Sequence, residues 1–421
     1  MTRALLSRRA LSALLCCAAL LAPAAQAADW VIRNATVMTV SQGTLENASV
    51  WVRDGRIAGV GVSVDAPADA QVIDGTGRFV TPGIVDPHSH IGTVGDGNEM
   101  SSPVTSQVRI ADVLVPTHKE FYFALAGGTT TQMILPGSAN LVGGQAAVVK
   151  NKFGLPLAQM LVADAPASMK FAIGENPKRT YGGRNQSPSS RMGNAAVLRQ
   201  ALDEAADYRR QRSGKPQDAP GRDLKKEALA GVLSGETLVQ IHAYRADEML
   251  TELGIAREFG YKVHAFHHAT DAYKIADILA REGGAIAVWS DWFGVKPEAM
   301  EAIPWNAVMA LRRGVRVALH SDSADITRRL NHEAAKIMRY GGATREEALR
   351  MITLDAAWII GLQDRVGSLD VGKDADLVVW SADPMSAYAL ADQVYIEGVL
   401  YFDRSLAGTG TPRFSGVMSG D

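Results

Sequence analysis

The chain has 421 residues, of which 47% are hydrophobic and 21% charged, and its formal net charge is −2 at pH 7. This composition is typical of a globular protein with room for a large core, and the balanced charge excludes the basic surface of a nucleic-acid-binding protein. Beyond residues 1–27, no apolar stretch is long enough to cross a membrane as a helix.

Residues 1–27 have the pattern of a secretory signal peptide. A basic segment, MTRALLSRR, precedes an apolar stretch, ALSALLCCAALLA, and a small-residue cleavage site, AQA. We therefore expect an exported protein, periplasmic or secreted, and the Arg8–Arg9 pair leaves both the general and the twin-arginine export routes open. Cys16 and Cys17 both lie in this leader, so the mature chain could bind a metal only through His, Asp, Glu or modified Lys.

Residues 28–83 predict a small antiparallel β unit. Short β-branched runs such as DWVIRNATVMTV and ASVWVRDGRIAGVG are separated by Asp-Gly and similar turn signals. The same pattern returns in residues 364–421, in DADLVVW and QVYIEGVLYFDR. We therefore expect one β-sandwich domain, formed by both ends of the chain around an inserted domain.

Residues 84–363 alternate between apolar strands and helical patterns. Segments such as AAVLRQALDEAADYRRQ and RADEMLTELGIAREFG have helical periodicity and lie between the strands. Eight strands in this alternation predict an α/β fold, the (β/α)8 or TIM barrel. The predicted strands are residues 83–90, 129–136, 145–150, 169–175, 237–243, 262–268, 285–291 and 315–322.

Histidine or aspartate closes four of these strands. In such a barrel the carboxyl ends of the strands form the active-site face. His88 and His90 share one face of the first strand, because side chains alternate along a strand. The other strand-end residues are His242, His268 and Asp322. Imidazole and carboxylate are ligands that Zn²⁺, Mn²⁺ and Fe²⁺ accept, so the pattern predicts a metal site.

Three motifs in order resemble the amidohydrolase superfamily. TPGIVDPHSH is similar to its PGxxDxHxH signature, TLDAAWIIGL to its terminal barrel helix, and GSLDVGKDADLVVW to the strand pair that follows the barrel. The resemblance covers nearly the whole mature chain. It is closest to the branch that is grouped with imidazolonepropionase and secreted prolidase-type dipeptidases.

The resemblance implies a pair of divalent ions, which are expected to be Zn²⁺, with Mn²⁺ or Fe²⁺ as alternatives. His88, His90 and Asp322 would bind the first ion, and His242 and His268 the second.

The bridging ligand is expected to be Lys150, with an N-carboxylated side chain. A lysine at the end of an apolar strand has a lowered pKa and can react with CO₂. The family's carboxylated lysine usually ends the fourth strand, whereas Lys150 ends the third in our assignment. Glu175, at the end of the fourth strand, is therefore an alternative, and Lys152 a third candidate.

Neighbouring polar residues are expected to have supporting roles. Of the adjacent His267 and His268, only one should face the barrel mouth, and the family pattern selects His268. His264 and His320 are interpreted as buried core residues, although His320 could tune Asp322. Asp86 should orient the histidines of the first strand.

The expected activity is hydrolysis of a C–N bond by a metal-bridging hydroxide, with Asp322 as general base and then acid. The substrate would be a small molecule: a dipeptide, an N-acyl amino acid or a cyclic amide. A basic loop was expected to bind a substrate carboxylate, through Lys178, Arg179, Tyr181, Arg184 and Arg191.

Other functions stay open at this stage. They are a lactonase, a deaminase, an imidazolonepropionase-like ring hydrolase, and an exported binding protein without turnover. The sequence also leaves room for a homo-oligomer.

Overall fold

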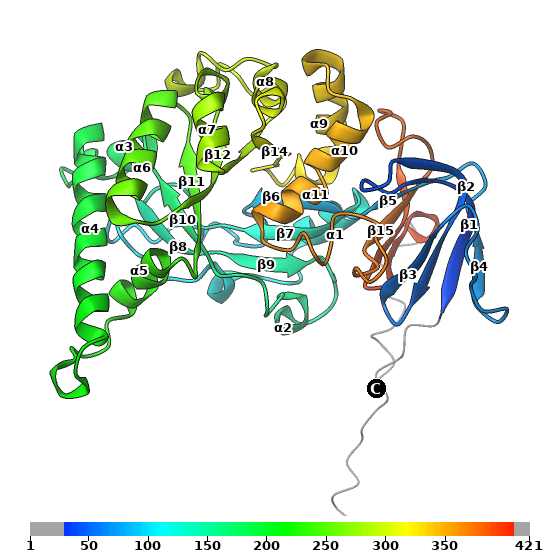
Figure 1. Cartoon of the computed structure of the whole chain (residues 1–421), viewed down its shortest axis with the longest axis horizontal. Helices are drawn as coiled ribbons and strands as arrows, with labels where there is room; N and C mark the ends of the chain where they lie inside the picture. Colours follow the sequence, from blue (N-terminus) through cyan, green and yellow to red (C-terminus); the bar gives the residue numbers. More distant parts are fainter. Residues whose placement is uncertain (1–28, 408–421) are drawn as a thin grey trace, which may run out of the picture.

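The structure, a computed structural model, describes residues 29–407 and contains a helix-covered barrel beside a β domain (Figure 1). The predicted signal peptide lies outside the described residues. None of the helices within residues 29–407 is long and apolar enough to cross a membrane.

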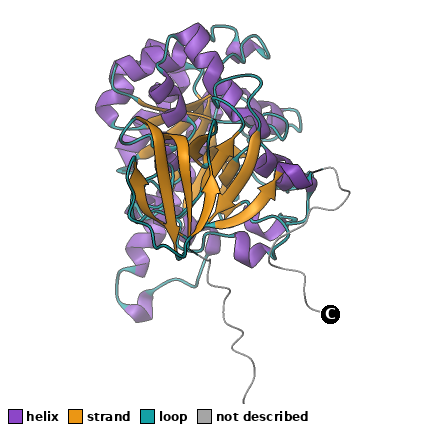
Figure 2. Ribbon diagram, turned by 90° about the vertical axis from the view of Figure 1, so that its right-hand side faces the viewer, coloured by secondary structure: helices purple, strands orange, loops and turns teal. Residues whose placement is uncertain are grey.

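The β domain is built from both ends of the chain, as predicted. Its strands are β1 (Trp30–Met38), β2 (Thr44–Arg53), β3 (Arg56–Gly61), β4 (Gln71–Asp74), β5 (Phe79–Pro82), β15 (Leu377–Trp380), β16 (Ala391–Ile396) and β17 (Val399–Asp403). They form one hydrogen-bonded sheet of order β17-β16-β15-β5-β1-β2-β3, with β4 paired to β1. The two ends meet where β15 runs antiparallel to β5, with Leu377 opposite Pro82. Figure 2 looks onto this domain, with the helices of the barrel around and behind it.

The central strands form two sheets that together make the wall of the barrel. They are β6 (Ile84–Ser89), β7 (Thr129–Ile134), β8 (Val142–Gln145), β9 (Ala147–Lys150), β10 (Ser168–Ala172), β11 (Leu238–Ala243), β12 (Val263–His268), β13 (Ala285–Val288) and β14 (Arg316–Leu319). Nearly all of their residues are buried, as expected of strands that are covered on both faces. Only Ala146 separates β8 from β9, so the segment that pairs with β10 continues into the segment that pairs with β7. On the other side, Asp322 N–H donates to the His88 carbonyl at 3.0 Å and joins β14 to β6.

The third strand of the barrel runs in the opposite direction from its neighbours. β8 is antiparallel to β10, and β9 is antiparallel to β7, with Lys150 opposite Thr131 near the start of β7. The last residue of β9 therefore lies at the amino ends of the neighbouring strands. The sequence analysis had placed this strand correctly along the chain but had assumed the parallel direction.

Helices cover the outside of the barrel. They are α1 (Lys119–Ala126), α2 (Leu157–Met160), α3 (Glu175–Gly182), α4 (Arg191–Arg212), α5 (Leu224–Ser234), α6 (Ala246–Phe259), α7 (Ala276–Glu282), α8 (Asn306–Arg312), α9 (Leu330–Lys336), α10 (Arg345–Met351) and α11 (Leu354–Ile359). Several begin with side-chain caps: Ser190 accepts from Gly193 N–H before α4, and Thr344 with Glu347 forms a capping box at α10. Their apolar faces pack on the strands and leave the strand ends open to carry the site.

Candidate metal centre

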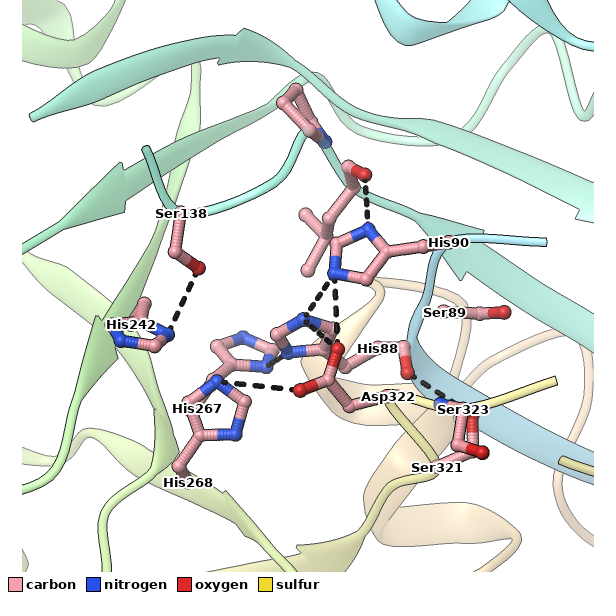
Figure 3. A network of polar contacts seen from close by, with 12 residues as sticks. His88, Ser89, His90, Ser138, His242, His267, His268, Ser321, Asp322 and Ser323 are labelled. Atoms are coloured by element: carbon pink, nitrogen blue, oxygen red, sulfur yellow. Dashed lines mark hydrogen bonds and ion pairs between the residues drawn. The ribbon is translucent and has the colours of Figure 1, made fainter. Parts of the chain in front are cut away.

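Histidines from three strands and one aspartate face a common space at the carboxyl ends of the parallel strands (Figure 3). His88 and His90 come from β6 and the residue after it, His242 from β11, and His268 from β12. Asp322 follows β14. The structure thus brings together five of the six residues that were predicted to bind metal.

A chain of hydrogen bonds fixes the imidazole of His88. Gln240 Nε2 donates to the Ile359 carbonyl at 3.0 Å, so its Oε1 accepts from His267 Nε2 at 2.9 Å. His267 Nδ1 then accepts from His88 Nδ1 at 2.9 Å. The network assigns the proton of His88 to Nδ1 and leaves the Nε2 lone pair pointing into the site.

A hydrogen bond also fixes the orientation and the tautomer of the His90 imidazole. Its Nδ1 donates to the Leu135 carbonyl at 2.7 Å, which leaves Nε2 without a proton. This Nε2 lies 3.2 Å from His88 Nε2 and 3.1 Å from Asp322 Oδ1, and His88 Nε2 lies 3.6 Å from the same oxygen. Three electron-rich atoms therefore converge with no proton assigned between them.

This convergence fits a cation. Two neutral imidazole nitrogens and a carboxylate oxygen repel one another at such distances unless a positive charge lies among them. Burial lowers the pKa of His88 well below its ordinary value, and the positive charge of Lys170 lowers it further. The donor set is the one that Zn²⁺ accepts when thiolates are absent.

His268 and His320 add nitrogens that lack hydrogen-bond partners. His268 Nδ1 and both nitrogens of His320 are buried and unpartnered among the described residues. One nitrogen each of His88, His268 and His320 lies within 4.8 Å of the others, a second grouping that could hold an ion. His320 is therefore part of the centre, rather than only a core residue behind it. Burial lowers its pKa to about 3, so it is neutral and able to act as a ligand.

Both His267 and His268 point into the barrel, but of the two His268 alone offers a nitrogen to the candidate metal groups, and His267 lies behind His88, bonded to its Nδ1. The His88 ring centroid lies 4.8 Å from that of His267 and 4.9 Å from that of His268. The physical reason is the backbone: φ is +71° at His268 and +39° at Ala269, which breaks the alternation of side chains at the end of β12. Asp322 also has a positive φ, +48°, and such strained residues are typical of functional sites. His264, in contrast, stacks on Trp358 at 4.2 Å, away from the centre.

His242 lies on one side of the centre among hydrogen-bonding groups. Its ring centroid is 4.5 Å from that of His268. Ser138 Oγ lies 2.9 Å from His242 Nδ1, and Asn176 Nδ2 lies 3.4 Å from His242 Nε2. Sequence reasoning had not singled out Ser138 or Asn176, which come from the loop after β7 and from α3.

Asp86 has the orienting position that was expected. Its carboxylate accepts the N–H of His88 at 3.2 Å and the hydroxyl of Ser321 at 2.5 Å. It thereby ties the strand that carries the first two histidines to the segment that carries Asp322. Burial raises its pKa to about 6.

Lys150 is not part of the centre, and this corrects the prediction that it bridges two metals. Its Nζ lies 2.6 Å from Asp374, 3.2 Å from Asp376 and 3.0 Å from Glu397, all in the β domain or the segment leading to it. Burial alone would lower its pKa, but these carboxylates outweigh it and the pKa is raised. Because its strand is antiparallel, Lys150 lies at the opposite end of the barrel and stays protonated, which prevents reaction with CO₂.

Lys170 is the lysine that lies near the centre, and sequence reasoning missed it. It is fully buried in β10, the fourth barrel strand, and its Nζ donates to the Pro136 carbonyl at 3.1 Å. Burial lowers its pKa to about 8, and its positive charge acts on His88, His242 and His268. The available signal was the family's preference for a lysine on the fourth strand, which Lys170 satisfies two residues before the end of β10.

The two alternatives to Lys150 are also held elsewhere. Glu175 forms ion pairs with Lys178 at 3.1 Å and with Arg191 at 3.5 Å. Lys152 pairs with Glu397 at 2.6 Å, in the same network as Lys150.

The predicted carboxylate-binding loop is largely committed to internal contacts. The Tyr181 hydroxyl is buried and donates to Asn140, and Arg184 donates to the Met100 carbonyl. Arg191 binds Glu248 through a hydrogen bond of 2.6 Å. The expected role in holding a substrate therefore does not apply to these side chains.

An aromatic wall, which we define as Tyr244, Trp289 and Trp292, borders the centre beside His242 and His268. Trp289 stacks on His268 with ring centroids 4.4 Å apart, and Tyr244 also stacks on His268, at 5.1 Å. Trp292 in turn stacks on Trp289 at 5.0 Å. The wall shields His268 and gives the site an apolar face.

Comparison with known proteins agrees with this geometry. Residues 264–402 match the model that describes the amidohydrolase family. A solved amidohydrolase from Thermotoga maritima MSB8 is 40% identical, with 89% of this chain and 100% of that chain covered and a TM-score of 0.84. The amidohydrolase TasK of Hapsidospora irregularis is 34% identical over 373 residues, which are 80% of this chain but only 38% of TasK. An imidazolonepropionase of Sphingopyxis alaskensis is 27% identical over 386 residues, covering 84% of this chain and 91% of its own.

The likeness to the Thermotoga protein extends over the whole of that chain. The chain belongs to the amidohydrolase family.

Proposed function

We propose that this amidohydrolase-family hydrolase is metal-dependent and cleaves a C–N bond in a small substrate. The convergence of His88 Nε2, His90 Nε2 and an Asp322 oxygen carries the proposal, because this arrangement fits a bound cation. The amidohydrolase and imidazolonepropionase relatives support the class of bond. A dipeptide, an N-acyl amino acid or a cyclic amide would be the substrate.

His88, His90 and Asp322 would hold one divalent ion, and His242 and His268 a second, with His320 adjacent to both. Lys170 replaces Lys150 as the proposed bridging residue. Its amine would add to CO₂ with loss of one proton, and the resulting carbamate would give the two cations a shared anion. A pKa of about 8 leaves part of Lys170 neutral at physiological pH, as this reaction needs.

A bound divalent ion would supply Lewis-acid polarisation of the scissile carbonyl and a lowered pKa for water. Asp322 would move the protons. Burial alone would raise its pKa, but the interactions with His90, His320 and Lys170 outweigh burial, and the pKa is lowered. Asp322 is therefore a carboxylate at neutral pH, able to accept a proton from water and pass it to the leaving nitrogen.

The leader pattern of residues 1–27 supports an exported enzyme.

Ser138 and Asn176 would orient the substrate beside His242.

Metal content tests the proposal. Elemental analysis of protein purified without chelator should find about two metal ions per chain in the wild type. Lys170→Met should reduce this number, whereas Lys150→Met should retain it. A wild-type protein without bound metal, from cells supplied with Zn²⁺ and Mn²⁺, would contradict the proposal. Metal retained in Lys170→Met would remove Lys170 from the bridge while leaving the rest intact.

A further inference from the structure

Lys296 lies in the loop after β13, where it borders the metal centre from the side of His242. Its Nζ is 4.1 Å from the centroid of the Tyr244 ring. The Tyr244 ring centroid is in turn 5.0 Å from that of His242. Lys296 thus presents a cation to the part of the centre that His242 occupies.

Contacts with neighbouring residues position the ammonium of Lys296 but leave hydrogen-bond donors available for a further partner. Glu298 Oε1 is its ion-pair partner at 3.4 Å, a distance too long for a good hydrogen bond. The other oxygen of Glu298 already accepts the N–H of Glu175 at 3.1 Å. The Lys296 side chain keeps 29% of its exposure, whereas Glu298 keeps 3%. The buried carboxylate and the Tyr244 ring therefore position a lysine whose donors still reach solvent-accessible space.

Two polar side chains lie beside His242, in the part of the centre that the Lys296 charge borders. Asn176 and Ser138 place an amide and a hydroxyl within 3.4 Å of the His242 ring nitrogens. Tyr244, over which Lys296 lies, begins the aromatic wall, which continues through Trp289 and Trp292 past His268. A substrate with one anionic end and one apolar end would be matched in a single orientation, with its anionic end toward Lys296 and its apolar end along Trp289 and Trp292.

We infer that Lys296 binds a carboxylate of the substrate, and that it performs the function first expected of the basic loop at residues 174–193. This inference rests on the proposed function and narrows its substrate class to N-acyl amino acids and dipeptides with a free carboxylate near the scissile bond. Lysine suits this role as a point charge with three donors. Lys296 acts here as a specificity-determining residue.

Matched substrate pairs test the inference. A panel of N-acetyl-L-amino acids and their primary amides is assayed with the metal-loaded wild type, Lys296→Met, Lys296→Arg and Lys274→Met. A hydrogen bond to a charged group is worth about 10- to 100-fold in binding. Lys296→Met should therefore raise KM for the carboxylates by about 10- to 100-fold and change kcat little. The amides should be unaffected, and Lys296→Arg should restore much of the preference.

Lys274→Met is the matched control, since Lys274 is a half-buried lysine that is paired with Asp271 and lies 5.5 Å from the centroid of the Tyr273 ring. It should retain the wild-type preference for carboxylates. Equal losses on acids and amides in Lys296→Met would show that Lys296 only balances Glu298, and would overturn the inference.

Binding separates this inference from the proposed function. The shift in melting temperature caused by N-acetyl-L-leucine and by its amide is measured for the wild type and for Lys296→Met. A wild-type protein that hydrolyses no member of the panel, but binds the acid through Lys296, would overturn the proposed function and support the carboxylate site. A wild type that binds acid and amide equally would overturn the carboxylate site, even if it hydrolyses both.

Discussion

Asp322 combines a strained backbone with a carboxylate that two imidazoles approach within 3.6 Å. Replacing it by Asn keeps the shape but removes the ability to accept a proton. General acid–base catalysis contributes about 10²–10⁴-fold to rates, so Asp322→Asn should lower kcat by about that factor. Steady-state kinetics on the best substrate would measure it, with metal content as the control. A variant with full metal content and nearly wild-type kcat would exclude Asp322 as the proton carrier.

For single residues, the sequence predicts which side chains belong to the centre better than it predicts where each of them points. His88, His90, His242, His268 and Asp322 were recognisable because each follows an apolar run at a strand end. His267 also points into the barrel, behind His88, because the alternation rule holds only while the backbone stays extended, and φ at His268 is +71°. Lys170 was missed because a lysine within an apolar strand has no pattern that distinguishes it from one with a structural role.

Helix α6 contains a buried acid whose ionisation should affect stability. Glu252 is 2% exposed, and its Oε2 has no hydrogen-bond partner among the described residues. Burial raises its pKa from 4.5 to about 8. Between these values the folded protein holds a proton that the unfolded chain has lost. The free energy of unfolding should therefore fall as the pH rises from 4.5 to 8, by up to about 1.4 kcal/mol per unit for this group.

Urea denaturation at pH 5.5 and pH 8 checks this expectation. Glu252→Gln should reduce the loss of stability between the two values and should be more stable than the wild type at pH 8. Asp277→Asn, on α7 at an exposed ion pair with Arg281, is the control and should keep the wild-type dependence. An unchanged pH dependence in Glu252→Gln would show that Glu252 does not titrate in this window.

Strand order and strand direction differ in how well the sequence predicts them. All eight predicted barrel strands have counterparts in the structure, because apolar runs bounded by turn residues identify buried strands. Their direction has no such signal, since the pattern of a buried strand is the same when it runs parallel or antiparallel. The wrong direction for the strand predicted at residues 145–150 was enough to move Lys150 from one end of the barrel to the other.

Lys150 links the barrel to the β domain through buried charges. Asp374 and Asp376 are each at most 4% exposed, and Lys150 itself is 1% exposed. Removing one partner of a buried ion pair typically costs about 3–5 kcal/mol, because the other charge stays buried without compensation. Lys150→Met should therefore lower the free energy of unfolding by about that amount while leaving metal content unchanged.

Chemical denaturation with Lys152→Met as a matched control measures this contribution. Lys152 pairs with Glu397 nearer the surface, where an ion pair is worth at most about 1 kcal/mol. A Lys150→Met protein as stable as Lys152→Met would show that the network contributes little to the contact between barrel and β domain.

The sheet of the β domain also determines when the molecule can be completed during synthesis. β5 leaves the ribosome before any barrel strand, whereas its partner β15 leaves after all of them. Until then β5 has an unpaired edge, which is a template for pairing with another chain. A nascent or truncated chain would carry this edge for as long as the barrel takes to be made, so aggregation during expression should be most sensitive to truncations just before residue 377.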